Sequence, residues 1–190
     1  MAQISLWLLA GVMLCSIPAG SLEDNIHWVH TGDKGRVLIL LSQLEKTPPY
    51  FCLADRNDFK FPWKLQTMMQ MNKTQRICLH HVMTAQIFKI FATRRSFAEW
   101  DRNRLSKVLS SLHQSLEDLE DQAQKEKNNL ACPNLGVLAR KYFRKIPKYL
   151  KEKKYSSCAW EVVLVEMMAR VGNMLLSLKK SQQIQNKFIW

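Results

Sequence analysis

The chain of 190 residues is long enough for one domain of ordinary size and too short for two. Hydrophobic residues make up 47% of it, which argues against intrinsic disorder, and counts of only 6 Gly and 6 Pro favour long helices over a strand-rich sandwich. The formal net charge of +12 permits attraction to heparan sulfate, membranes or nucleic acid, although a solvated basic surface is the simpler explanation.

The amino-terminal segment has the pattern of a secretory signal peptide. Residues 4–17 are apolar apart from two serines, and Ala19 and Ser21 fit the small residues of a cleavage site. We therefore expect a signal peptide over residues 1–21 and a secreted, extracellular domain over residues 22–190; a retained anchor is the alternative. No later run approaches about 20 apolar residues, so we expect a chain that is not membrane-embedded. Secretion also argues against a nucleic-acid partner.

Secretion changes the interpretation of the cysteines. Cys15 would leave with the signal peptide, whereas Cys52, Cys78, Cys132 and Cys158 would remain. An even number of cysteines in an exported chain suggests two disulfides. Four cysteines allow three connectivities, and their spacing alone does not choose between them.

Hydrophobic spacing and proline positions predict five helices and one long connection. The helices are expected at residues 36–44, 76–92 and 96–125, from residue 135 onwards, and from Ser156 or Ser157 to about residue 180. The connection over residues 47–75 has a length that is usually functional in a compact domain. A long crossover lets two successive helices run parallel, which favours a helical bundle with cytokine topology.

Three residues modify this pattern. Asn72 belongs to the sequence's only N-glycosylation sequon, in or just after the long connection. Pro147 lies inside the fourth predicted helix, where proline removes a hydrogen bond and kinks or ends the helix. Glu161 lies near the first turn of the last predicted helix, where an acidic side chain favours helix initiation.

The last predicted helix has two apolar faces. At about 100° per residue, Trp160 belongs to a stripe that we expect to face the core. Five further small or apolar residues fall outside that stripe: Val165, Met168, Ala169, Gly172 and Leu176. A second apolar face on a soluble protein indicates either a surface for a partner or packing beneath the long connection.

Two segments resemble type I interferons closely. Residues 52–62 carry the motif C-L-A-D-R-N-D-F, residues 151–163 carry C-A-W-E, and weaker matches over residues 86–91, 100–101 and 140–143 keep the same order. The resemblance implies an all-α fold, an up-up-down-down four-helix cytokine bundle with an additional fifth helix. It also implies a secreted monomer that binds a two-subunit cell-surface interferon receptor and triggers antiviral and antiproliferative signalling.

The resemblance implies one disulfide and suggests another. In that family the cysteines of the two segments pair, which are Cys52 and Cys158 here. That bridge closes a loop of about 100 residues and, in the chain-entropy model, contributes about 4.7 kcal/mol. Alpha- and omega-type members carry a second bridge from the mature N-terminus to the third helix, but both of its cysteines are missing here. We hypothesise that Cys78 and Cys132 form a replacement at the same end of the bundle; free or intermolecular thiols are the alternative.

The high-affinity receptor subunit of relatives contacts the first long loop and the outer face of the last helix. The resemblance carries these contacts over to five residues, Leu53, Arg56, Val165, Met168 and Ala169. Of these, Arg56 is expected to make a charge-assisted hydrogen bond, and Met168 to fill an apolar pocket.

The low-affinity subunit contacts the second to fourth helices, which implies roles for Phe88, Lys89 and Arg140, although a core role for Phe88 is the alternative. Relatives often carry Arg where this chain has Leu164 and Ala169. A secreted receptor-binding antagonist, or a heparan sulfate-binding factor of the same fold, is therefore the alternative function. The heparan sulfate site would lie on the basic fourth helix.

No sequence signature indicates an enzyme. The chain contains no H-E-x-x-H, G-x-S-x-G or P-loop motif. His80 and His81 are adjacent, so on a helix they point about 100° apart and suit one metal ion poorly. We therefore expect no catalytic residues, no metal and no cofactor.

Overall fold

The computed structural model describes residues 35–125 and 132–187, with side chains as far as residue 178. This part of the chain forms helices and no strand, which confirms the all-α prediction, and none of its helices is long and apolar enough to cross a membrane. The predicted signal peptide lies outside the described residues. The elements are α3 (Arg36–Ser42), the 3-10 helix η2 (Pro49–Asp55), α4 (Leu65–Gln70), α5 (Lys73–Phe91), α6 (Arg94–Glu99), α7 (Arg102–Lys125), α8 (Pro133–Phe143), α9 (Lys145–Glu152) and α10 (Ser157–Lys187).

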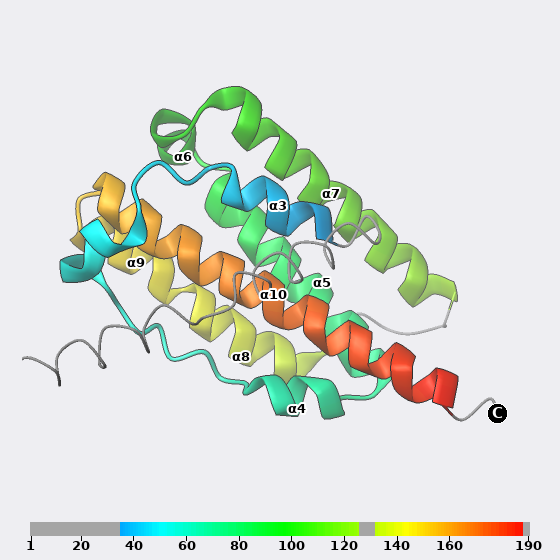
Figure 1. Cartoon of the computed structure of the whole chain (residues 1–190). Helices are drawn as coiled ribbons and strands as arrows, with labels where there is room; N and C mark the ends of the chain where they lie inside the picture. Colours follow the sequence, from blue (N-terminus) through cyan, green and yellow to red (C-terminus); the bar gives the residue numbers. More distant parts are fainter. Residues whose placement is uncertain (1–34, 126–131, 188–190) are drawn as a thin grey trace, which may run out of the picture.

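Four helices form the bundle in the predicted up-up-down-down order. In Figure 1, α3 and α5 run from right to left, whereas α7 and α10 run from left to right. The additional fifth helix is the pair α8 and α9, which runs beside α5 and antiparallel to α10. The connection from α3 to α5 travels the whole length of the bundle, because two parallel helices start at the same end.

The core lies where the five helical segments meet. α10 contributes most to it: Trp160, Val163, Leu164 and Met167 are at most 2% exposed. The predicted core role of Trp160 is therefore confirmed. The burial of Leu164 also changes an expectation, because a residue that points into the core offers no surface position for the arginine of relatives.

The long connection is folded, although the sequence predicted no helix within it. η2 and α4 both pack against α10, and Phe59, Trp63 and Met68 of the connection are buried. The connection therefore covers part of the second apolar face of α10. Val165 and Leu176 of that face stay 42% and 48% exposed.

The helix predicted over residues 96–125 is divided into α6 and α7. Trp100 has extended backbone angles (φ −108°, ψ 160°), which end α6. Its buried indole lies against the rings of Phe91 and Trp160, with centroids 5.2 and 4.9 Å away. Asp101 Oδ1 then accepts a hydrogen bond (2.9 Å) from the backbone N–H of the third residue of α7. The burial of one indole therefore interrupts the helical periodicity.

The fourth predicted helix is also divided, but only slightly. Arg144, between α8 and α9, keeps right-handed helical angles (φ −62°, ψ −23°). Pro147 is the third residue of α9, and backbone N–H groups in a first turn have no partner within the helix. A new helix that begins just before the proline resolves the conflict noted in the sequence.

Asn72 caps α5, which begins three residues earlier than predicted. Its Oδ1 accepts a hydrogen bond from the backbone N–H of Gln75 (2.8 Å), and its own N–H donates to Gln75 Oε1 (3.1 Å). This reciprocal arrangement is a capping box. It uses the oxygen of the Asn72 side chain, whereas a glycan would be attached to the nitrogen.

We expect the capping and glycosylation roles of Asn72 to be separable. Asn72→Asp removes the glycan acceptor but keeps a capping oxygen, whereas Asn72→Ala removes both. In unglycosylated protein, the alanine variant should lose about 1 kcal/mol of unfolding free energy relative to the aspartate variant. Urea denaturation measures this difference, and equal stability of the two variants would argue against the cap.

Glu161 is the fifth residue of α10, just beyond the first turn, and it is buried. It is 3% exposed, and its Oε1 has no hydrogen-bond partner among the described residues. Burial raises the pKa of this carboxyl above its usual range, although the backbone N–H groups of Lys46 and Thr47 act in the opposite direction. Ionised Glu161 therefore opposes folding at neutral pH.

We expect Glu161→Gln to raise the unfolding free energy, relative to wild type, by more at pH 7 than at pH 3. A carboxyl whose pKa is raised on folding binds its proton more tightly in the folded state. Its contribution to stability is complete below the unfolded pKa and is lost as pH rises through the folded pKa. Urea midpoints of both proteins at the two pH values test this, and a pH-independent difference would contradict it.

Candidate functional site

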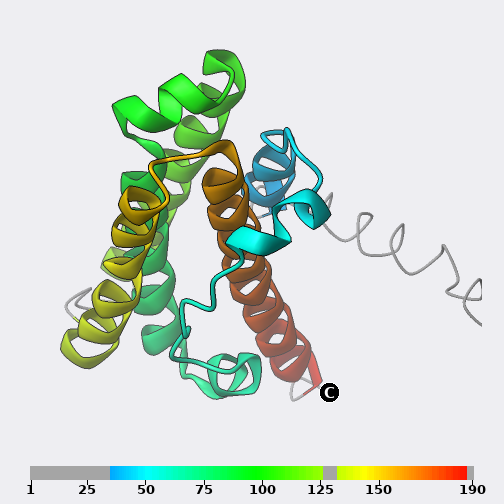
Figure 2. The same ribbon diagram turned by 90° about the vertical axis from the view of Figure 1, so that its left-hand side faces the viewer.

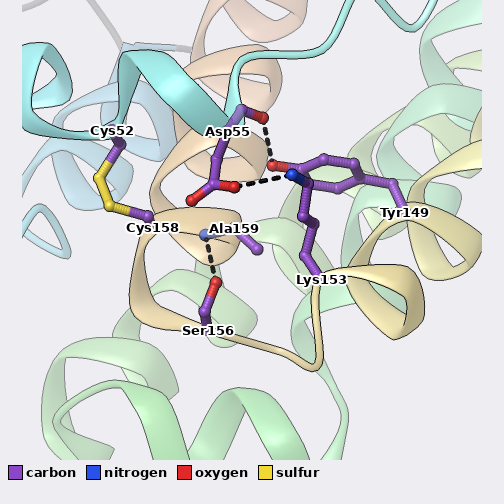
Figure 3. Close-up of a disulfide and its surroundings, with 7 residues drawn as sticks. All are labelled: Cys52, Asp55, Tyr149, Lys153, Ser156, Cys158 and Ala159. Carbon is purple, nitrogen blue, oxygen red and sulfur yellow. Dashed lines mark hydrogen bonds and ion pairs between the residues drawn. A yellow bond between two sulfur atoms is a disulfide. The ribbon is translucent and has the colours of Figure 1, made fainter.

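A disulfide attaches η2 to the start of α10. Cys52 lies in η2 and is 2% exposed, Cys158 is the second residue of α10, and their Cα atoms are 5.1 Å apart (Figure 3). That separation lies within the usual range for disulfides. The structure thus contains the pairing that the resemblance implies, and η2 has a fixed position on the bundle.

Two contacts fix the other end of η2 to α9 and its C-cap (Figure 3). Tyr149 Oη donates a hydrogen bond to the carbonyl oxygen of Asp55 (2.7 Å), and Lys153 Nζ lies 2.9 Å from Asp55 Oδ1. Burial, with a smaller contribution from the Asp55 charge, raises the pKa of Tyr149 to about 12. The hydroxyl therefore keeps its donor proton at physiological pH.

The chain after η2 is held by aromatic packing. The Phe59 ring meets the Tyr149 ring edge-on at a centroid distance of 5.2 Å, and Lys145 Nζ donates a hydrogen bond to the Phe59 carbonyl oxygen (2.8 Å). Further along, the Arg170 guanidinium of α10 lies 4.4 Å from the ring centroid of Phe61. These contacts tie the connection to α9 and α10 along its path.

The outer surface of η2 carries large apolar side chains that are open to solvent. Tyr50, Phe51 and Leu53 are 63%, 67% and 63% exposed, and the rings of Tyr50 and Phe51 have centroids 4.3 Å apart. Exposed neighbours of this size on a fixed segment indicate an interaction surface. Tyr50 and Phe51 were not among the predicted site residues, although the sequence places these two adjacent aromatic residues directly before Cys52.

The exposed apolar face of α10 lies on the same side as η2. At about 100° and 1.5 Å per residue, Val165 and Ala169 lie within about 20° of Cys158 around the helix axis and about 10–17 Å along it. Since Cys158 carries the bridge to η2, the two segments present one surface. We call it the η2/α10 surface; it comprises Tyr50, Phe51, Leu53, Arg56, Val165, Met168 and Ala169.

The residues carried over for the high-affinity subunit all belong to the η2/α10 surface. Leu53, Arg56, Val165 and Ala169 are exposed, whereas Met168 is half-buried and packs against the core. The structure therefore brings together two groups that lie more than a hundred residues apart in the sequence. Ala169 supplies no cation at this surface.

The three residues carried over for the low-affinity subunit lie elsewhere. Lys89 is exposed on α5, Arg140 is exposed on α8, and these helices pack against each other. The Arg140 guanidinium folds back over Gly136, whose added Cβ would lie 3.1 Å from Arg140 Nη1. Phe88 is half-buried and packs against the core, in agreement with the alternative role considered for it.

A second disulfide joins α5 to the residue before α8. Cys78 and Cys132 are bridged, and their Cα atoms are 6.1 Å apart. The bridge lies at the end of the bundle where α5 begins, opposite the end that carries Cys52 and Cys158. It fastens the additional helical pair to the bundle, at a distance from the η2/α10 surface.

Residues 29–181 match the family model of the interferon alpha/beta domain. Human interferon omega-1 is 37% identical over 191 residues, covering 98% of this chain and 96% of the relative. Interferon alpha-2 of Equus caballus is 39% identical over 165 residues, covering 85% of this chain and 90% of the relative. The similarity therefore extends through both disulfide-bearing ends of the bundle.

Solved structures agree in fold. Zebrafish interferon 1 superposes with a TM-score of 0.64 at 18% identity, covering 81% of this chain and 98% of the other. Zebrafish interferon 2 gives 0.62 at 18% identity, covering 75% and 95%. The family model and the curated relatives define a helical cytokine of a family whose members are not enzymes. The chain belongs to the type I interferon family.

Proposed function

We propose that this protein is a secreted, monomeric type I interferon that binds both subunits of a cell-surface interferon receptor and triggers antiviral and antiproliferative signalling. The observation that carries the proposal is the η2/α10 surface. It is apolar and exposed, and it is fixed in position by the Cys52–Cys158 bridge and the Asp55 contacts. A rigid surface loses little conformational entropy on binding.

The η2/α10 surface binds the high-affinity subunit. Leu53 and Val165 supply exposed apolar area, and the exposed Arg56 supplies a cation for a carboxylate of the receptor. Tyr50 and Phe51 extend the contact beyond the positions that the resemblance carries over. Large aromatic side chains are enriched among the residues that dominate binding energy.

The low-affinity subunit binds the α5/α8 side through Lys89 and Arg140. Phe88 packs against the core beneath that side. In Figure 2, α5 and α8 lie on one side of the bundle, and η2 with α10 lies on the other. One molecule can therefore contact two receptor chains without their competing for the same surface. Joining two chains is what activates kinases attached to them.

The test uses purified mature protein on reporter cells and on each isolated receptor ectodomain. We expect binding to both ectodomains and induction of an interferon-response gene at the doses that occupy the receptor. If the protein failed to bind one or both of the ectodomains, the proposal would be overturned. Response in cells that lack one subunit would overturn the two-subunit mechanism.

A receptor antagonist is the second candidate, and the absence of a cation at Ala169 favours it. A weakened high-affinity contact reduces the lifetime of a signalling complex. Full receptor occupancy without response-gene induction would establish the antagonist. Restoration of signalling by Ala169→Arg would identify the missing cation as its cause.

A further inference from the structure

The strongest concentration of positive charge lies on α8, α9 and the turn that follows them. Residues 140–154 contain eight Lys or Arg residues and a single acidic residue, Glu152. All nine of these side chains are exposed. The contacts proposed for the receptor use only Arg140 from this set, so most of the charge has no assigned role.

Helix geometry gathers four of these cations into one line. At about 100° per residue, Arg140, Arg144, Lys148 and Lys151 fall within an arc of about 80°, over a length of about 16 Å. The near-helical angles of Arg144 keep α8 and α9 in one register. The buried Tyr142, Ile146 and Tyr149 lie on the opposite side of the same axis. We call the line the basic stripe; it comprises Arg140, Arg144, Lys148 and Lys151.

The basic stripe has little internal neutralisation. Lys148 Nζ lies 3.9 Å from Glu152 Oε1, at the limit of an ion pair. No ion pair among the described residues involves Arg140, Arg144 or Lys151. Two neighbouring lysines are different, because Lys145 and Lys153 bind the connection at Phe59 and Asp55. The stripe is therefore open to an external anion, and the exposed Lys141 and Lys154 lie beside it.

We propose that the basic stripe is a binding site for a sulfated polysaccharide chain, of the heparan sulfate class. Its sulfate and carboxylate groups repeat along a line, as the cations of the stripe do along α8 and α9. Arginine and lysine form charge-assisted hydrogen bonds with such oxygens. A row of like charges also focuses the electrostatic potential and raises the association rate of a polyanion.

A polysaccharide fits the stripe better than an anionic membrane surface does. Peripheral membrane helices insert large apolar side chains between lipids and carry basic residues beside them. On α9 the large apolar residues Ile146, Tyr149 and Leu150 are at most 3% exposed. The outer face of α9 is therefore charged without a large apolar group to insert, and on the α8 part of the same face the exposed apolar side chain is a single valine, Val137.

The experiment measures binding of full-length mature protein to a heparin oligosaccharide at several salt concentrations. The variant Arg144→Gln/Lys148→Gln/Lys151→Gln removes three cations and leaves Arg140, the proposed receptor contact, in place. At about 0.2–1 kcal/mol for each exposed charge pair, the dissociation constant should rise about tenfold. Wild-type affinity should fall as salt increases.

The matched control is Arg94→Gln/Arg102→Gln/Lys107→Gln, which removes three exposed cations from α6 and α7. It should change the dissociation constant less than about twofold, because salt screens charges that lie far from the bound polyanion. Equal weakening by both variants would show that binding depends on the net charge of the protein and not on the basic stripe, and would overturn the proposal. Binding of wild type to phosphatidylserine vesicles, but not to the oligosaccharide, would overturn it as well. Circular dichroism and receptor-ectodomain binding of both variants separate this result from misfolding and from failure of the proposed function.

Discussion

Replacing both Cys52 and Cys158 by serine should reduce the unfolding free energy by about 4–5 kcal/mol. The bridge closes a loop of 106 residues in sequence separation, so its loss releases a large entropy in the unfolded chain. The same variant should bind the high-affinity subunit more weakly, because η2 then loses its covalent attachment to α10 and is held only by packing and by the Asp55 contacts. Urea denaturation and ectodomain binding measure the two effects.

The Cys78→Ser/Cys132→Ser variant is the matched control. Its loop has a sequence separation of 54, and the chain-entropy model gives a stability loss only about 0.6 kcal/mol smaller. Its affinity for the high-affinity subunit should stay near that of wild type, since this bridge lies at the other end of the bundle. Equal loss of affinity in both variants would contradict a positioning role for the Cys52–Cys158 bridge.

Truncation of the η2 side of the binding surface should cost most of the receptor affinity. We expect Leu53→Ala and Arg56→Ala each to weaken binding to the high-affinity subunit by about 2 kcal/mol, or roughly 30-fold. Phe51→Ala should weaken it too, because that ring is 67% exposed in the same segment. Surface plasmon resonance should show the change mainly as faster dissociation.

Val137→Ala tests whether this effect is specific. Val137 is 55% exposed on α8, so the substitution removes comparable apolar surface from a different side of the molecule. It should leave binding to the high-affinity subunit unchanged. Comparable weakening by Val137→Ala would indicate that the interface with the high-affinity subunit does not lie on η2. Unchanged stability of all four variants would confirm that binding, and not folding, is affected.

Local features of the sequence predicted the fold class and the order of the helices. Apolar spacing located α5, α7 and α10 because these helices bury apolar residues along their length, whereas α3 ends at Ser42, earlier than the position predicted from Pro48 and Pro49. Helix boundaries were less predictable. The start of α5 depends on the reciprocal hydrogen bonds of Asn72 and Gln75, which spacing alone does not reveal.

Residues with unexpected positions have tertiary causes. Trp100 ends α6 because its indole packs between Phe91, at the end of α5, and Trp160 of α10, which is 60 residues further along the chain. Leu164 lies in the core although relatives carry arginine there, so the number of missing surface cations falls from two to one. η2 and α4 both pack against α10, a tertiary contact that the sequence pattern of the connection does not reveal.

For this protein, the sequence by itself determined an all-α bundle with a long crossover, an even set of cysteines and a family resemblance. These features depend on residue type and spacing, which act locally along the chain. Only the tertiary structure decided that Tyr50, Phe51 and Leu53 share one exposed surface with Val165 and Ala169. The reason is that burial depends on contacts between distant segments, and the Cys52–Cys158 bridge brings those segments together.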